Sequence, residues 1–153
     1  MTKIALGADH AGYQMKEAVK AHLEIQGYEI VDFGTANTAA VDYPDYCRPA
    51  AESVARGDSD CGLVFGGSGN GEAMVANKVP GIRCGVCWNI ESARLTKEHN
   101  NANVIALGGR MVSQAEGIAI VDAWLNAAFQ GGRHQRRIEK IETNCREIPE
   151  KRQ

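Results

Sequence analysis

The sequence contains no long hydrophobic run, so neither a membrane-spanning helix nor a secretory leader is expected among its 153 residues. The first apolar stretch is short and is soon interrupted by Asp9 and His10. A strong excess of one charge is also missing, because the formal net charge is only -2. We therefore expect a cytoplasmic protein whose overall charge favours neither nucleic acid nor a membrane surface.

A disulfide framework and a metal site also lack support in the sequence. The five cysteines are an odd number, and Cys84 and Cys87 have the spacing of a zinc or redox pair without a second pair or paired histidines to complete it. Both lie in a predicted strand, where residues three apart face opposite sides. We predict ordinary reduced thiols for all of them: Cys47, Cys61, Cys84, Cys87 and Cys145.

What the sequence does show is a regular alternation of short apolar runs and amphipathic segments. We predict strands over 3–8, 29–33, 61–65, 82–87 and 104–107, and helices over 11–26, 44–56, 72–77, 91–99, 113–129 and 131–142. Strands that alternate with helices favour a parallel sheet covered on both faces. The length suits one domain over residues 1–153, and the polar end, 147–153, is expected to fray.

Unusual polar residues follow three of the predicted strands. Asp9 and His10 come after the first, the stretch FGGSGNGE (65–72) after the third and Arg110 after the fifth. In parallel α/β sheets, ligands bind beyond the carboxyl ends of the strands. We therefore expect the chemistry of this protein at that edge.

The glycine-rich stretch predicts a site for an anion or an oxyanion. It is not a dinucleotide fingerprint, because the third glycine would fall on Glu72, and it lacks the Gly-Lys-Ser/Thr of a P-loop. Its four glycines, Gly66, Gly67, Gly69 and Gly71, exceed what a tight turn needs. They allow backbone N–H groups to approach a ligand closely.

Glu72 ends this stretch and begins a predicted helix, where an acid is common because it interacts well with the helix dipole. Beside backbone donors, however, a carboxylate suits proton abstraction next to a carbonyl, since the donors stabilise the oxyanion that forms. Burial would raise the pKa of Glu72, whereas the helix terminus and the backbone donors would lower it. The sequence does not decide between these influences.

Five motifs occur in order along nearly the whole chain: GADHAG, DYP, FGGSGNGE followed by VANK, KEHNNANVIALGGR and GGRHQRR. Together they resemble the type B ribose-5-phosphate isomerases of the ribose/galactose isomerase family. The resemblance implies a Rossmann-like, three-layer α/β/α sandwich around a five-stranded parallel sheet. It also implies interconversion of ribose 5-phosphate and ribulose 5-phosphate through an enediolate, in the pentose phosphate pathway, without metal or organic cofactor.

The resemblance also assigns roles to residues. One branch of the family has a catalytic cysteine where this chain has Gly66, so the chain is similar to the other branch, in which the glutamate, here Glu72, is the base. Ser68 would move a proton between the substrate oxygens, and the N–H groups near Gly69 and Gly71 would hold the enediolate. Further substrate contacts are implied for Tyr43, Gly67 and Asn70.

His99 corresponds to the acid/base that opens the sugar ring, with Asp9 in the same task, and Asn100 to a sugar contact. Without the resemblance, His99 would equally be a cation at a helix C-terminus and Asn100 a helix cap. Imidazole suits the task because it exchanges protons near neutral pH.

Phosphate recognition is implied for Arg133 and Arg137, which are four apart and share a helix face, together with His10 and Arg110. A solvated basic face is the alternative, and Arg136 and His134 are expected on other faces of this helix. The resemblance places these arginines in a neighbouring subunit's site. It thus implies a homodimer with shared active sites, with a tetramer of two dimers as a further option.

Two other functions stay open from the sequence. The chain would be an isomerase of a 6-phosphate hexose, of allose or galactose type, if the site accepts one more carbon. It would be a phosphosugar-binding protein without catalysis if the chemistry is lost. Trp88 and Trp124 are expected in core or interface packing.

Overall fold

The structure, a computed structural model, describes the backbone of residues 1–143 and the side chains of residues 1–142. Its centre is a parallel sheet of five strands in the order β2-β1-β3-β5-β4. The strands are β1 (Lys3–Ala8), β2 (Glu29–Asp32), β3 (Cys61–Gly66), β4 (Cys84–Val86) and β5 (Val104–Gly108). The predictions for Cys145 and for fraying of residues 147–153 lie outside the described residues.

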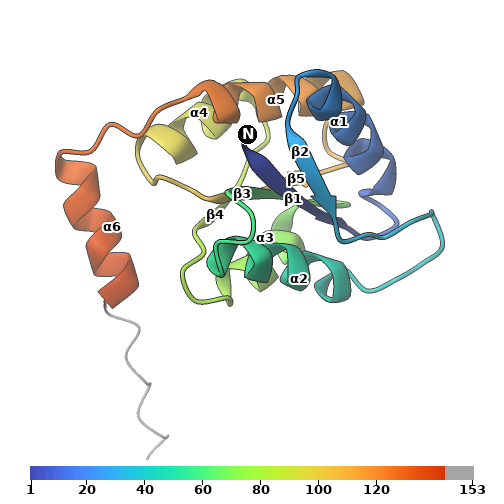
Figure 1. Cartoon of the computed structure of the whole chain (residues 1–153), viewed down its shortest axis with the longest axis horizontal. Coiled ribbons are helices and arrows are strands. Elements are labelled where there is room, and N and C mark those ends of the chain that lie inside the picture. Colours follow the sequence, from blue (N-terminus) through green and yellow to red (C-terminus); the bar gives the residue numbers. More distant parts are fainter. Residues whose placement is uncertain (144–153) are drawn as a thin grey trace, which may run out of the picture.

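Helices cover both faces of the sheet, as Figure 1 shows. One layer holds α1 (Tyr13–Ile25), α4 (Ile90–Glu98) and α5 (Gln114–Asn126), and the other holds α2 (Pro44–Ala55) and α3 (Asn70–Asn77). The predicted three-layer α/β/α architecture is therefore confirmed. None of the helices in the described part of the chain is long and apolar enough to cross a bilayer.

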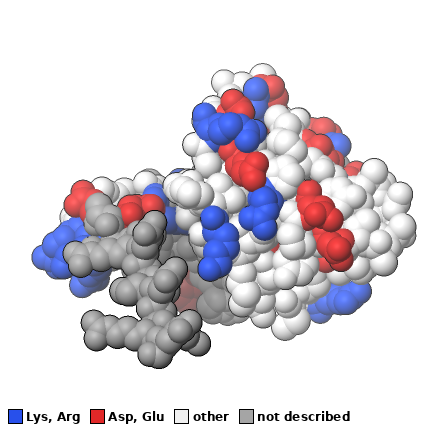
Figure 2. Space-filling view, turned by 90° about the horizontal axis from the view of Figure 1, so that it is seen from below, with Lys and Arg blue, Asp and Glu red and all other residues white. Residues whose placement is uncertain are grey.

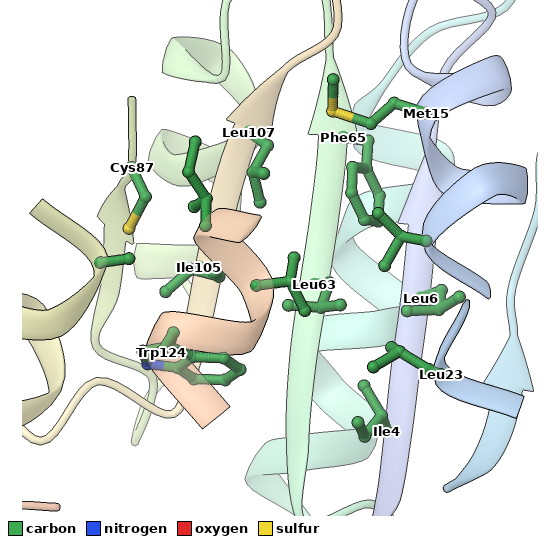
Figure 3. Packing of buried hydrophobic residues seen from close by; sticks show 14 of the residues in the cluster. Ile4, Leu6, Met15, Leu23, Leu63, Phe65, Cys87, Ile105, Leu107 and Trp124 are labelled. Atoms are coloured by element: carbon green, nitrogen blue, oxygen red, sulfur yellow. The ribbon is translucent and has the colours of Figure 1, made fainter. Parts of the chain in front are cut away.

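The three central strands are apolar except for Lys3 at the start of β1, because both of their faces are covered. Alternate residues enter opposite cores: Leu63 and Phe65 of β3 pack under α1 and α5, whereas Val64 packs under α2 and α3. Figure 3 shows the first core, in which Trp124 of α5 lies beside Ile105 and Leu63. Trp124 is thus a core residue, as predicted, whereas Trp88 is 63% exposed.

Several predicted boundaries differ from the structure for local reasons. The first helix begins at Tyr13, later than predicted, because the Asp9 side chain and backbone hold the chain before it in a turn. The fourth strand is limited to Cys84–Val86, since the Ile82 N–H donates to the Val79 carbonyl in a preceding turn. The fifth helix ends at Asn126, where Ala127 becomes extended, while Ser113 caps its start as predicted.

A last helix, α6 (Arg133–Thr143), stands away from the three layers (Figure 1). It is attached through an ion pair of 2.6 Å between Glu142 and Arg83, the residue just before β4. Seen from the side of α2 and α3, basic and acidic side chains are visible at this end of the molecule and across the rest of the face (Figure 2). The basic residues of α6 are Arg133, Arg136, Arg137 and Lys140.

Candidate active site

The loops that follow β1, β3 and β5 meet at the carboxyl edge of the sheet because these strands are neighbours at its centre. Backbone hydrogen bonds join them: the Asp9 N–H donates to the Phe65 carbonyl at 3.3 Å, and the Gly109 N–H to the Gly66 carbonyl at 2.6 Å. The fold therefore brings together the segments that the sequence singled out after three separate strands.

Asp9 is almost completely buried at this edge. Its Oδ1 accepts hydrogen bonds from the backbone N–H groups of Ala11 at 2.9 Å and Gly12 at 3.1 Å. These bonds hold the carboxylate in one orientation and shape the turn into α1. Asp9 thus has a structural role whatever its part in catalysis.

Glu72 lies in the first turn of α3 and is only 3% exposed. Its carboxylate fills the space beside Gly66, where a Cβ atom would overlap Oε1 and lie 2.7 Å from Oε2. Oε2 is buried and has no hydrogen-bond partner among the described residues. The arrangement leaves a carboxylate oxygen free to accept a proton.

The structure decides the direction that the sequence left open for the pKa of Glu72. Burial raises this pKa, and the negative charge of Asp9 adds to the increase, whereas the backbone N–H groups of Glu72 and Gly69 lower it. The net shift is upward. Glu72 is therefore a stronger base than an exposed glutamate, as proton abstraction from carbon requires.

The glycine-rich loop presents polar groups around this carboxylate. Gly69 has a φ of +86° and starts α3, and the N–H of Gly71 lies in the first helical turn, where no intrahelical acceptor is available. The Tyr43 ring closes one side, since a Cβ on Gly71 would lie 2.6 Å from the tyrosine oxygen. Ser68 is exposed, and its Oγ accepts from the Asn70 N–H at 3.2 Å, which leaves its hydroxyl hydrogen free.

Two further side chains that can carry a positive charge follow β1 and β5 at this edge of the sheet. His10 Nδ1 accepts a hydrogen bond from the Val41 N–H at 3.2 Å, so the proton of the neutral ring is on Nε2, which can donate to an anion. Arg110 donates its backbone N–H to the Gly67 carbonyl at 3.0 Å, and its guanidinium lies near Gly67. It forms no ion pair within the described part of the chain.

The other predicted site residues lie at the opposite edge of the sheet. His99 follows the last turn of α4, which returns antiparallel to β4, and Asn100 comes next. Arg83, just before β4, donates from Nε to the Asn100 carbonyl at 2.9 Å. Glu72, in contrast, lies beside Gly66 at the carboxyl end of β3. The predicted site residues of one chain therefore lie on two sides of the sheet.

Arg133 and Arg137 extend from α6 on this second side, and neither forms an ion pair with a described residue. A cavity of about 430 Å³ lies between β4 and α6 and is lined in part by Asn100. His134 was not among the predicted site residues, yet its ring is buried and stacks on His99. The signal was available, because His134 and Ile138 are four apart on the buried stripe of α6.

The cysteines behave as predicted in the described residues, where Cys47, Cys61, Cys84 and Cys87 are free. Burial raises the pKa of each thiol, to about 12 for Cys61 and Cys87. Thiols with such pKa values are poor nucleophiles at neutral pH. No group of three or more His, Cys, Asp and Glu side chains in the described part of the chain is arranged to hold a metal ion.

Comparison with known proteins agrees with this arrangement. The sequence profile of the Ribose/Galactose Isomerase family matches residues 4–141. The chain belongs to the ribose/galactose isomerase family. This confirms the family predicted from the motifs and, with it, an isomerase as the class of enzyme.

Among its relatives in the ribose/galactose isomerase family, the ribose-5-phosphate isomerase B of Mycolicibacterium paratuberculosis is 47% identical over 139 residues, which cover 90% of this chain and 87% of the relative. The solved structure of Clostridium thermocellum ribose-5-phosphate isomerase B has a TM-score of 0.91 and 49% identity and covers 92% of this chain and 95% of its own. The Mycoplasma genitalium ribose-5-phosphate isomerase B, solved with bound ribulose-5-phosphate, has a TM-score of 0.88 and 40% identity, covering 92% and 94%.

Proposed function

We propose that this chain interconverts ribose 5-phosphate and ribulose 5-phosphate through an enediolate, with Glu72 as the base. The observation that carries the proposal is the buried carboxylate of Glu72, whose pKa is raised and whose Oε2 lacks a partner among the described residues, beside the backbone donors of the glycine-rich loop. The ribulose-5-phosphate bound to the Mycoplasma genitalium relative supports the choice of substrate.

The geometry suggests how the proton moves. Glu72 takes the proton from C2 of the open-chain aldose, and the electron pair moves to the C1 carbonyl oxygen to form the enediolate. The N–H groups near Gly69 and Gly71 stabilise this charge. Ser68 transfers a proton between the two oxygens, and Glu72 returns its proton to C1, which gives the ketose.

The remaining groups act across two subunits in this proposal. His99 and Asn100 follow α4 at the edge of the sheet where Arg83 precedes β4, whereas Glu72 lies beside the carboxyl end of β3. In this proposal a second copy supplies His99 for ring opening with Asp9, Asn100 for the sugar, and Arg133 and Arg137 for the phosphate together with His10 and Arg110. In each shared site, one copy supplies Glu72 and the glycine-rich loop from its carboxyl edge, and the other copy supplies His99 and the arginines. The proposal therefore includes a homodimer with two shared sites.

The first test is NMR of ribose 5-phosphate with the purified protein in D₂O that contains a metal chelator. We expect ribulose 5-phosphate to form with deuterium at the carbon beside the carbonyl. Absence of both would overturn the proposal. The same experiment with allose 6-phosphate would then distinguish a hexose phosphate isomerase from a binding protein without catalysis.

Replacing Arg137 by alanine is expected to raise KM about 30-fold with a smaller effect on kcat, because a charge-assisted contact to phosphate contributes about 2 kcal/mol. Mixing this variant with Glu72→Gln tests the shared site. If Arg137 acts across the dimer, one of the two sites in each mixed dimer combines Glu72 of one chain with Arg137 of the other. That site should show the KM of the unchanged chain, so activity at low substrate concentration returns. Arg136→Ala, an exposed change on the same helix, should behave as the unchanged chain does. No recovery in verified mixed dimers would contradict the shared site.

The pH dependence should reflect the raised pKa of Glu72. Activity requires the carboxylate, so kcat/KM should fall as the pH decreases through a pKa above the usual glutamate value. The folded state binds this proton more tightly than the unfolded state, so Glu72 makes the protein less stable as the pH rises from the usual glutamate pKa through the raised one. A kcat/KM profile whose acid limb lies at or below the usual value would contradict this assignment.

A further inference from the structure

Within the described residues, the ring of His99 lacks the hydrogen bond that usually fixes a catalytic histidine. Among the described residues, no hydrogen bond to either ring nitrogen is present, and the ring's one directional contact is with His134. The two ring centroids lie 4.2 Å apart, and the planes differ by 13°. An acid/base is normally oriented by a third group. For His99, the stacked ring of His134 is the neighbour that could orient it.

His134 is suited to serve as a rigid support. It is 6% exposed, and its Nε2 is buried without a partner in the described part of the chain. Burial lowers the pKa of His134, and the nearby positive charges of His99, Arg133 and Arg137 lower it further. A neutral His134 ring can remain stacked whether His99 carries one proton or two.

The helix that carries His134 is fastened to the His99 segment at both ends. Before α6, Gln130 donates its backbone N–H to the Glu98 carbonyl at 3.0 Å and its side-chain Nε2 to Glu98 Oε2 at 3.2 Å. At the far end of α6, Glu142 pairs with Arg83, whose guanidinium also donates to the carbonyls of Asn100 and Asn101. The stack is thus held between two fixed segments.

We propose that His134 is a positioning residue, which holds the ring of His99 in the plane needed to open the sugar ring. The inference rests on the proposed function. In ring opening, a proton leaves the C1 hydroxyl, the bond between C1 and the ring oxygen breaks, and the ring oxygen receives a proton. A histidine that passes these protons must keep its nitrogens directed at both oxygens, so a freely rotating ring would be slower.

The substrate pair separates this step from isomerisation. Ribose 5-phosphate is largely closed into a furanose, whereas ribulose 5-phosphate cannot close a five-membered ring because its O5 carries the phosphate. Exchange of the C1 proton of ribulose 5-phosphate with D₂O therefore needs Glu72 but no ring opening. A defect in the orientation of His99 should affect one assay and spare the other.

The test compares two variants of His134. His134→Leu fills the buried position with an apolar side chain that has no ring, whereas His134→Phe fills it with an apolar side chain that keeps a planar ring. We expect His134→Leu to lower kcat/KM for ribose 5-phosphate between about 10- and 100-fold. Deuterium exchange of ribulose 5-phosphate should stay within about twofold of the unchanged chain. His134→Phe should recover most of the loss, and the exposed Arg136→Ala is the matched control on α6.

A double variant tests whether His134 acts through His99. If it does, His99→Ala with His134→Leu should be no slower than His99→Ala alone. Equal losses in both assays, additive losses in the double variant, or a phenylalanine no better than leucine would each overturn the inference. If the unchanged chain shows neither reaction, the proposed function itself fails. If it shows both and His134→Leu matches it, only the role of His134 fails.

Discussion

Glu72→Gln is expected to lower kcat for ribose 5-phosphate isomerisation about 10⁴-fold while the affinity for the phosphosugar changes only a few-fold. Glutamine keeps the shape of the side chain, and its amide oxygen can still accept hydrogen bonds, but it cannot take a proton from carbon. The turnover is measured by ribulose 5-phosphate formation and the affinity by calorimetry with ribose 5-phosphate. Near-normal turnover would contradict Glu72 as the base.

The same substitution should raise the melting temperature at neutral pH. Burial raises the pKa of Glu72, so the folded protein carries a carboxylate in a place that disfavours its charge. Removing that charge stabilises the fold at the cost of activity, as is common at active sites. Glu91→Gln is the matched control, because Glu91 is also in the first turn of a helix but is exposed. Glu91→Gln should change neither the melting temperature nor kcat.

The sequence was sufficient to predict the sheet and the meeting of three loops at its carboxyl edge. The buried strands read as apolar runs because both faces are covered, and the positions after β1, β3 and β5 follow from parallel topology alone. Asp9, the glycine-rich loop and Arg110 therefore meet where they were expected. Short edge elements were less predictable, because the start of β4 depends on a turn at Ile82.

The remaining features of the site depend on distances in three dimensions. The pKa of Glu72 is set by how much protein surrounds it and by Asp9, which no spacing reports. Asp9 and His99 were assigned to one task, yet the direction of α4 places them at opposite edges of the sheet. A motif names residues without saying at which edge of the sheet each one lies.

Gly66→Ala is expected to lower kcat/KM at least about 100-fold with little loss of stability. A Cβ at this position would overlap the Glu72 carboxylate, so the end of that flexible side chain would have to move by about an ångström or more. A displacement of this size in a reacting group costs about 100-fold in rate. Thermal unfolding beside the kinetics separates a displaced base from a damaged fold, and normal activity would show that Glu72 can act from another position.

The overlap between positions 66 and 72 also makes a reciprocal change testable. In the family branch with a catalytic cysteine, that cysteine occupies the position of Gly66, where the space is here filled by the Glu72 carboxylate. Removing the carboxylate should make room, so Gly66→Cys combined with Glu72→Ala should recover measurable isomerisation relative to Glu72→Ala alone. Gly66→Ala with Glu72→Ala is the control, because it adds a Cβ atom at the same position but supplies no thiol. Recovery in both double variants would mean that a side chain of any kind at position 66 restores the reaction. Recovery with cysteine alone would show that the pocket accepts a base from either position.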